Sequence, residues 1–273
     1  MAQPGSTPEY GRPPVSEVAL SIEFSPLERW TASQALLYGK LLQEDYPQME
    51  IRPALPSQIE KFGDANWQAP QVRLEVMNPE ANRFWFLAEP SNWLIQLQQD
   101  RFIVNWRKVS GEEVYPRYLS SIRPRFEKEL QRFLAFLEQQ GLGSVNVRQC
   151  EVTYVNDMYR GREWETLSEG IAFLSFLSGF GKGKFLPPPE ALSVAGSYLL
   201  PEEKGRLHFS VNHVLREPGN KEALQLRLTA RGKPESSSAE NVMRWLDMGR
   251  EWIVRGFDEL TSDRADKVWD KKP

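Results

Sequence analysis

The sequence predicts an α+β protein with a mainly antiparallel sheet and long helices packed on one face of that sheet. Three observations predict this class: short segments in which apolar and polar residues alternate, several such segments in succession, and a few long segments with helical periodicity. The order strand, helix, three or four strands, helix occurs twice. We therefore expect two topologically similar halves, residues 15–143 and 144–273, in one compact unit. A leader rich in Pro, Gly, Ser and Thr, residues 1–14, is expected to be disordered.

The first half begins with the segment EVALSIEF, residues 17–24, whose alternation is typical of a half-buried strand. A helix is expected next. Thr31 and Gln34 form a capping box at its start, and Leu37 and Leu41 share one of its faces.

The stretch 51–70 carries Pro53, Pro56 and Pro70 and indicates a long connection. Up to four strands then follow one another without a helix between them. These are QVRLEVM (71–77), RFWFLAE (83–89), WLIQLQ (93–98) and RFIVNWRKV (101–109).

The last two of these strands predict a hairpin with a two-residue loop at Gln99 and Asp100. This register pairs Leu97 with Phe102, Ile95 with Val104, and Trp93 with Trp106. All six apolar side chains then share one face, and each cross-strand pair contributes about 0.2 to 1 kcal/mol. The opposite face carries polar side chains.

A long helix is expected over residues 116–143, ending near Gly141, and Pro124 either kinks it or divides it in two. The second half then follows the same order and closes with a long helix from about Ser237. Its other elements are VRQCEVTYVN (147–156), a short apolar helix EGIAFLSFLSGF (169–180), ALSVAGSYLL (191–200), RLHFSVNHVL (206–215) and ALQLRLTARG (223–232).

Composition narrows the function classes. A formal charge of −3 disfavours a protein whose main task is to neutralise phosphates. The single cysteine excludes an internal disulfide framework and fits a reducing cytoplasm. No apolar run approaches the roughly 18 residues needed to span a bilayer, so we expect a cytoplasmic protein with no membrane association. The nine tryptophans indicate large buried cores or binding hot spots.

Motifs for catalysis or metal binding are weak. His208 and His213 lie five residues apart on one expected strand, so they point to opposite faces and cannot bind one metal together. Cys150 is expected to be a small buried hydrophobe. The segment GFGKGK, residues 179–184, lacks the spacing of a phosphate-binding loop and is followed by prolines. We therefore expect no cofactor, no metal and no catalytic residue.

The polar sheet face is the candidate binding surface. Such a face is usually only the solvated side of an antiparallel sheet, where Lys and Glu dominate. Here Gln and Asn are prominent, and their side chains both donate and accept hydrogen bonds. The candidate partner-binding residues are Gln96, Gln98, Asn105, Arg107, His208 and Arg227.

Four segments resemble a known family when taken together: VSEVALSIEFSPLERW, IQLQQDRFIVNWR, YPRYLSSIRPRFEKELQRFLAF and CEVTYVN. They are similar to a sporadically distributed bacterial family of uncharacterised proteins. The resemblance covers residues 15–160 well and the rest loosely. It implies genes that travel on mobile or defence loci, including loci linked to phage or CRISPR immunity, and it implies no catalytic residues.

Three functions remain open from the sequence. The first is a non-enzymatic module that binds another protein, as an accessory of such a defence system. The second is a nucleic-acid-binding saddle of the TATA-binding type, which the acidic balance disfavours. The third is a small-molecule enzyme with a site between sheet and helices, which requires a deep pocket with convergent polar groups.

Overall fold

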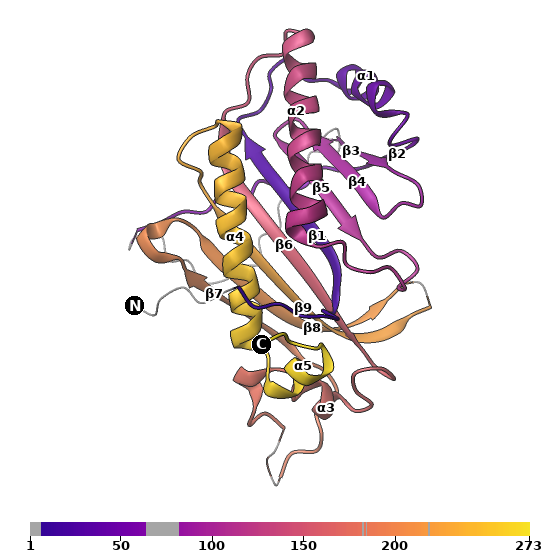
Figure 1. Ribbon diagram of the computed structural model, residues 1–273, viewed down its shortest axis with the longest axis vertical. Helices are drawn as coiled ribbons and strands as arrows, with labels where there is room; N and C mark the ends of the chain where they lie inside the picture. The colour runs from indigo at the N-terminus through magenta and orange to yellow at the C-terminus, as the bar shows by residue number, and fades with distance from the viewer. Residues whose placement is uncertain (1–6, 64–81, 182, 184, 218) are drawn as a thin grey trace.

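The computed structural model describes residues 7–63, 82–181, 183, 185–217 and 219–273. In this described part of the chain, nine strands form one antiparallel sheet in the order β2-β3-β4-β5-β1-β6-β9-β8-β7 (Figure 1). The strands are β1 Val15–Phe24, β2 Gln48–Pro53, β3 Asn82–Leu87, β4 Trp93–Gln98, β5 Arg101–Arg107, β6 Val147–Tyr159, β7 Ser193–Leu199, β8 Arg206–Arg216 and β9 Lys221–Gly232. The protein is therefore α+β. The strand expected over residues 71–77 lies outside the described residues.

The sheet has β1 and β6 as neighbours at its centre. Strands β5, β4, β3 and β2 continue outward from β1, and β9, β8 and β7 continue outward from β6. Each side of the sheet is thus formed by one continuous part of the chain. A common plan for the two sides stays a prediction.

The hairpin of β4 and β5 has the predicted register. Trp93 lies opposite Trp106, Ile95 opposite Val104, and Leu97 opposite Phe102. Ile95, Leu97, Phe102 and Val104 are at most 1% exposed, so the apolar face of this hairpin is core. Pairing of large apolar side chains across antiparallel strands selects this register because a slip of one residue would bury the polar side chains instead.

The described helices are α1 Ala32–Leu42, α2 Arg123–Gln139, α3 Leu167–Ile171, α4 Ala239–Leu260 and α5 Asp263–Val268, with a π-helical turn at Tyr118–Ile122 and 3-10 turns at Ser175–Leu177 and Pro201–Glu203. Pro124 lies in the first turn of α2, where a missing N–H costs nothing. Helical backbone runs from the π-helical turn directly into α2, so the helix expected over residues 116–143 changes type next to this proline and is not divided by it. The expected helix 169–180 is divided into α3 and a 3-10 turn.

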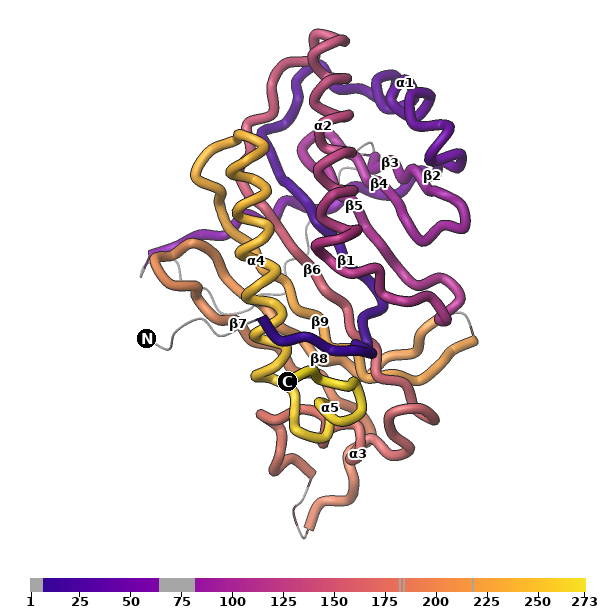
Figure 2. Tube along the Cα trace, viewed as in Figure 1, coloured from indigo at the N-terminus to yellow at the C-terminus, as the bar shows by residue number. Residues whose placement is uncertain are grey.

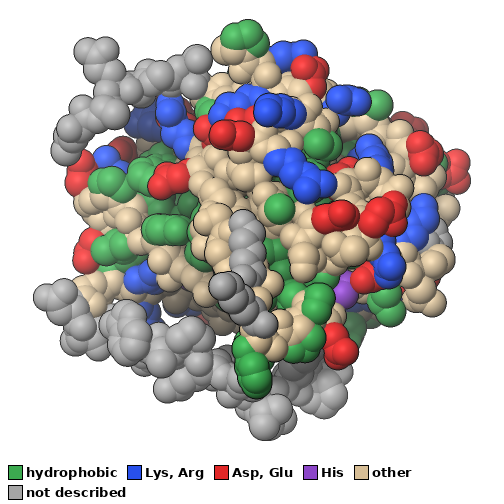
Figure 3. Space-filling model, turned by 90° about the horizontal axis from the view of Figure 1, so that it is seen from below, with side chains coloured by type: hydrophobic (Ala, Val, Ile, Leu, Met, Phe, Trp, Pro, Cys, Tyr) green, Lys and Arg blue, Asp and Glu red, His purple; other side chains and the backbone are tan. Residues whose placement is uncertain are grey.

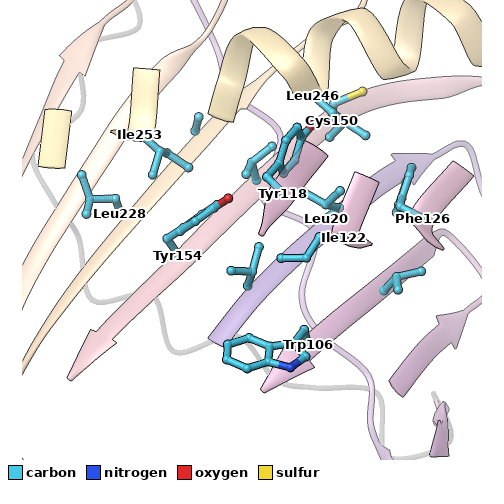
Figure 4. Packing of buried hydrophobic residues seen from close by; sticks show 14 of the residues in the cluster. Leu20, Trp106, Tyr118, Ile122, Phe126, Cys150, Tyr154, Leu228, Leu246 and Ile253 are labelled. Atoms are coloured by element: carbon cyan, nitrogen blue, oxygen red, sulfur yellow. The ribbon is translucent and has the colours of Figure 1, made fainter. Parts of the chain in front are cut away.

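The core fills the space between the sheet and the two long helices, which lie in front of it in Figure 1. The ring of Phe102 on β5 stacks on Phe133 of α2, with ring centroids 5.1 Å apart. On α4, a methyl group added to Gly256 would come within 2.8 Å of Leu207 on β8, so this glycine permits close packing. Figure 4 shows side chains of the sheet and of both helices meeting in this layer.

The chain before β1 differs from the expected disordered leader. Residues 1–6 lie outside the described residues, but Tyr10 is 5% exposed and bridges to Lys271 near the other end of the chain. Its hydroxyl donates to Asp258 Oδ1 at 2.7 Å. Figure 2 shows this segment beside the end of α4 and α5. This segment is ordered by contacts with residues far away in the sequence, and such contacts leave no pattern in the segment's own sequence.

Two further differences concern the edge of the sheet. Strand β2 falls where the sequence indicated the start of a connection, and it is an edge strand, ending at Pro53. Helix α1 forms where expected, and the Gln34 side chain accepts a hydrogen bond from the Thr31 N–H. The face that carries Leu37 and Leu41, however, is exposed.

Candidate functional site

The polar face of the sheet contains a chain of side-chain hydrogen bonds across β3, β4, β5 and β1. Arg83 Nη1 donates to Gln96 Oε1 at 2.8 Å. Gln96 Nε2 donates to Asn105 Oδ1 at 2.7 Å, and Asn105 Nδ2 donates to Glu17 Oε1 at 2.6 Å. Gln96 and Asn105 are only 7% and 3% exposed. Their hydrogen-bonding groups are therefore engaged within the protein.

A second part of this face is covered by the chain itself. Residues 54–63, here called the strap, follow β2 and have no regular secondary structure. Figure 2 shows the chain after β2 running behind the sheet. The strap contacts β4 through Gln98, β5 through Arg101, β1 through Glu23, β6 through Gln149, and β8 through Arg206 and His208.

Two glutamines hold the strap by its backbone. Gln98 Oε1 accepts from the Leu55 N–H at 3.0 Å, and Gln98 Nε2 donates to the Leu55 carbonyl at 3.1 Å. Gln149 accepts from the Glu60 N–H at 2.8 Å and donates to the Gln58 carbonyl at 2.9 Å. A carboxamide can do both because it carries a donor and an acceptor. The glutamine side chains thus replace the ladder bonds that a further strand would supply.

Charged groups fix the far end of the strap. Glu60 Oε1 lies 2.6 Å from His208 Nε2, and the other carboxylate oxygen pairs with Arg206. Burial acts to raise the pKa of the Glu60 carboxyl, but the hydrogen bonds and charges of His208 and Arg206 outweigh it and hold this pKa below its usual value. At neutral pH, Glu60 is therefore an ionised anchor.

The six residues predicted to bind a partner are thus in different situations. Gln96 and Asn105 bond to each other, whereas Gln98 and His208 hold the strap. The other two are more accessible. Arg107 is half-buried, donates to the Ser91 carbonyl and lies 5.5 Å from the Trp85 ring, and Arg227 is exposed. The expectation of one open polar surface does not hold, because the chain uses most of these groups itself.

Other candidate groups lie apart. His213 pairs with Glu222 at 2.7 Å rather than with His208. Cys150 is fully buried, and burial raises the pKa of its thiol. Lys182 and Lys184 of the segment GFGKGK lie outside the described residues. Among the residues that are described, no group of three or more His, Cys, Asp and Glu side chains is arranged to hold a metal ion.

An open surface lies instead at the β2 edge of the sheet. The α1–β2 surface, as we call it, consists of three apolar side chains that are between 43% and 57% exposed: Leu36, Met49 and Ile51. Helix α1 buries Ala35, Tyr38 and Leu42 against the core, and its other exposed leucines, Leu37 and Leu41, lie on the flank opposite to Leu36. Exposed apolar side chains that lie together indicate a contact surface.

Within the part of the chain that the structure describes, no segment pairs with the backbone of β2 on the side away from β3. Proline is tolerated on an edge strand where its missing N–H faces away from the sheet, which places Pro53 in that orientation. Outward-facing positions alternate, so Ile51 and Met49 share this orientation. The alternate residues of the strand, Glu50 and Arg52, form an ion pair on its polar side. The sequence carried the signal for this surface in the extra leucine of α1, Leu36.

Figure 3 views the end of the molecule that carries α3 and α5, where side chains of both signs are scattered among apolar ones. Within the described residues, no helix is both long and apolar enough to cross a membrane.

Comparison of the chain with protein-family models, with curated proteins and with solved structures finds no match. The α1–β2 surface and the polar face are therefore interpreted from their own geometry.

Proposed function

We propose that this protein is a non-enzymatic interaction module and that its α1–β2 surface binds a second copy of the chain. The observation that carries the proposal is that the exposed side chains of Leu36, Met49 and Ile51 lie beside an edge of β2 that no described strand pairs with. Edge strands are templates for pairing with another chain, and proteins that avoid pairing protect them. Here the apolar side chains of Met49 and Ile51 favour pairing, and Pro53, which has no N–H to donate, confines the new ladder to a few bonds around Ile51.

Charge pattern supports a second copy as the partner. In an antiparallel pair related by a two-fold axis through Ile51, Glu50 of each chain lies opposite Arg52 of the other. Strand β2 is therefore complementary to itself, as an isologous interface requires. The outward N–H and C=O groups of Ile51 would form the central pair of hydrogen bonds.

Helix α1 would close over the new strand pair. Gly39 packs against Phe86 and lies near Met49, and Leu36 stands three residues before Gly39 on the same flank of the helix. Leu36 therefore flanks β2, where it would be covered by the second copy. Removal of this apolar surface from water supplies the driving force for association.

The experiment uses charge reversal on β2. The wild-type chain is expected to sediment with about twice the 31.5 kDa mass of one chain. Glu50→Arg places four positive charges across the strand pair, and Arg52→Glu places four negative ones, so each variant is expected to be monomeric. Mixing the two variants restores opposite charges and is expected to restore dimers.

This mixing experiment separates the contact between chains from the ion pair within one chain. A pair that acts only within the chain is absent from both variants, so mixing would restore nothing. A monomeric wild-type chain at high concentration, or dimers that survive in both single variants, would contradict the proposal.

We also infer that the two sides of the sheet are versions of one plan that join at β1 and β6, with α2 and α4 as corresponding helices. Their strand order supports this inference. A nucleic-acid saddle would need the polar face, which the strap crosses from β4 to β8. For this reason the protein-binding function is the one we propose.

A further inference from the structure

A cavity of about 380 Å³ lies between α4, β6, the π-helical turn and the segment before β1. Its volume is within the range of small-molecule sites. The side chains that line it divide into a polar and an apolar group. On α4, Arg250, Ile253 and Phe257 all line the cavity, so its lining changes from cationic to apolar over about 10 Å of helix.

The polar end carries two arginines without a carboxylate partner. Among the described residues, neither Arg250 nor Arg117 forms an ion pair. Arg117 donates hydrogen bonds to the Tyr10 and Gly11 carbonyls, whereas no oxygen accepts a hydrogen bond from the buried Nε of Arg250. The Arg250 guanidinium lies 5.6 Å from the centre of the Tyr118 ring, and that of Arg117 lies 5.9 Å from the centre of the Tyr115 ring. Of the described residues that line the cavity, one carries a carboxylate, the exposed Glu9. A buried donor without an acceptor is costly, which favours an anion here.

Two tyrosine hydroxyls complete this end. Tyr115 and Tyr154 oxygens lie 3.0 Å apart and share a hydrogen bond. Burial raises the pKa of both hydroxyls, so both keep their protons at neutral pH. The shared bond uses one of the two hydrogens, which leaves one O–H group for a further acceptor. Figure 4 shows Tyr118 and Tyr154 between the sheet and α4, with Ile253 beyond them.

We propose that this cavity binds a small amphipathic carboxylate, with its head between Arg250 and the tyrosine hydroxyl and its apolar body along Ile253, Val254 and Phe257. The planar guanidinium of arginine matches a carboxylate with two parallel hydrogen bonds. The apolar end offers no donor for a second anionic group. The site is separate from the α1–β2 surface and does not depend on it.

The test uses two probes of matched shape, 4-phenylbutanoate and its neutral analogue 4-phenylbutan-1-ol, titrated into the full-length chain in a calorimeter. The carboxylate is expected to bind saturably, at least about tenfold more tightly than the alcohol, because only the carboxylate pairs with arginine. Equal affinities for the two probes, or no saturable binding of the carboxylate, would overturn the proposal.

Variants locate the site. Arg250→Met is expected to weaken binding of the carboxylate by about tenfold or more while leaving that of the alcohol unchanged, and Arg250→Lys to restore part of the loss. Val254→Trp fills the apolar end and is expected to weaken both probes. The matched control is Arg244→Met on the exposed side of the same helix, which should change neither.

Circular dichroism and thermal unfolding establish that each variant is folded. If Arg250→Met does not fold, the comparison of Val254→Trp with the wild-type chain decides: unchanged binding of 4-phenylbutanoate by a folded Val254→Trp variant would place the ligand elsewhere and contradict the proposal.

Discussion

The polar face of the sheet and the α1–β2 surface reverse the usual relation between polarity and exposure. On the polar face, Gln98 and Gln149 are 4% and 3% exposed and bind the chain's own backbone. On the α1–β2 surface, the side chains of Leu36, Met49 and Ile51 are about half exposed. Polar side chains are thus used inside the protein, and apolar side chains are left outside.

The difference teaches that polarity alone does not identify a free surface. A glutamine that satisfies both an N–H and a C=O group of an extended segment belongs to the fold, because those backbone groups would otherwise lack partners. An exposed leucine beside an open strand edge has no such role in the fold. Substitutions of the buried glutamines should therefore lower the free energy of unfolding. Substitutions on the α1–β2 surface should instead weaken association and leave the stability of the monomer almost unchanged.

The largest effect is expected for Gln149→Leu. This change removes both hydrogen bonds to the strap and leaves the Gln58 carbonyl and the Glu60 N–H without partners. We expect the free energy of unfolding to fall by about 2 to 4 kcal/mol, which urea unfolding measures. Hydrogen exchange at the amides of residues 55–62 should accelerate.

The control is Gln131→Leu, a glutamine on the exposed side of α2. It should alter the free energy of unfolding by less than about 0.5 kcal/mol. Equal, small losses in both variants would mean that the strap is not held by its glutamine.

An intermediate effect that depends on pH is expected for Glu60→Gln. The pKa of the Glu60 carboxyl is lowered in the folded protein, so this group adds stability above its usual pKa, and that stability is lost as the pH falls through the lowered pKa. We expect a loss of about 1 to 2 kcal/mol at pH 7. The difference between variant and wild type should shrink from about pH 5 downward.

Unfolding titrations across this pH range measure the difference. The control is Glu240→Gln, which removes an exposed carboxylate that pairs with Arg244. Its free energy of unfolding should differ little from that of the wild-type chain at any pH in this range. A Glu60→Gln difference that stays constant with pH would argue against an ionised anchor.

The smallest effect on stability is expected for Leu36→Ser, because this side chain is 51% exposed. The free energy of unfolding of the monomer should change by less than about 0.5 kcal/mol, whereas the dimerisation constant measured by sedimentation should weaken by about tenfold. Leu42→Ser, at a fully buried position of the same helix, should instead destabilise the monomer by several kcal/mol. If the Leu36→Ser variant associates as strongly as the wild-type chain, α1 is not part of the interface.

Local pattern was sufficient for the hairpin of β4 and β5. Six large apolar side chains spaced two apart admit one register in which all six share a face, and the structure has that register, with five of them buried and Trp93 partly buried. The capping box at Thr31 and an irregularity of the long helix near Pro124 were also readable, because both depend on neighbours a few residues away.

The strap and β2 were not readable in this way. The residues that bind the strap come from β4, β6 and β8, and the strap itself has neither helical nor strand periodicity. Strand β2 is short and contains a proline, so its pattern resembles that of a connection. The sequence showed that glutamines are prominent on the polar face, but it did not show that the strap covers them.

The sequence by itself determined the fold class and which face of each central strand is apolar, because pleating sorts alternate side chains to opposite faces whatever lies around the strand. Only the tertiary structure decided which polar groups are already satisfied and which apolar groups stay exposed. Those outcomes depend on segments far apart in the sequence meeting in space, such as Glu60 and His208, which are 148 residues apart. No local spacing encodes such a meeting.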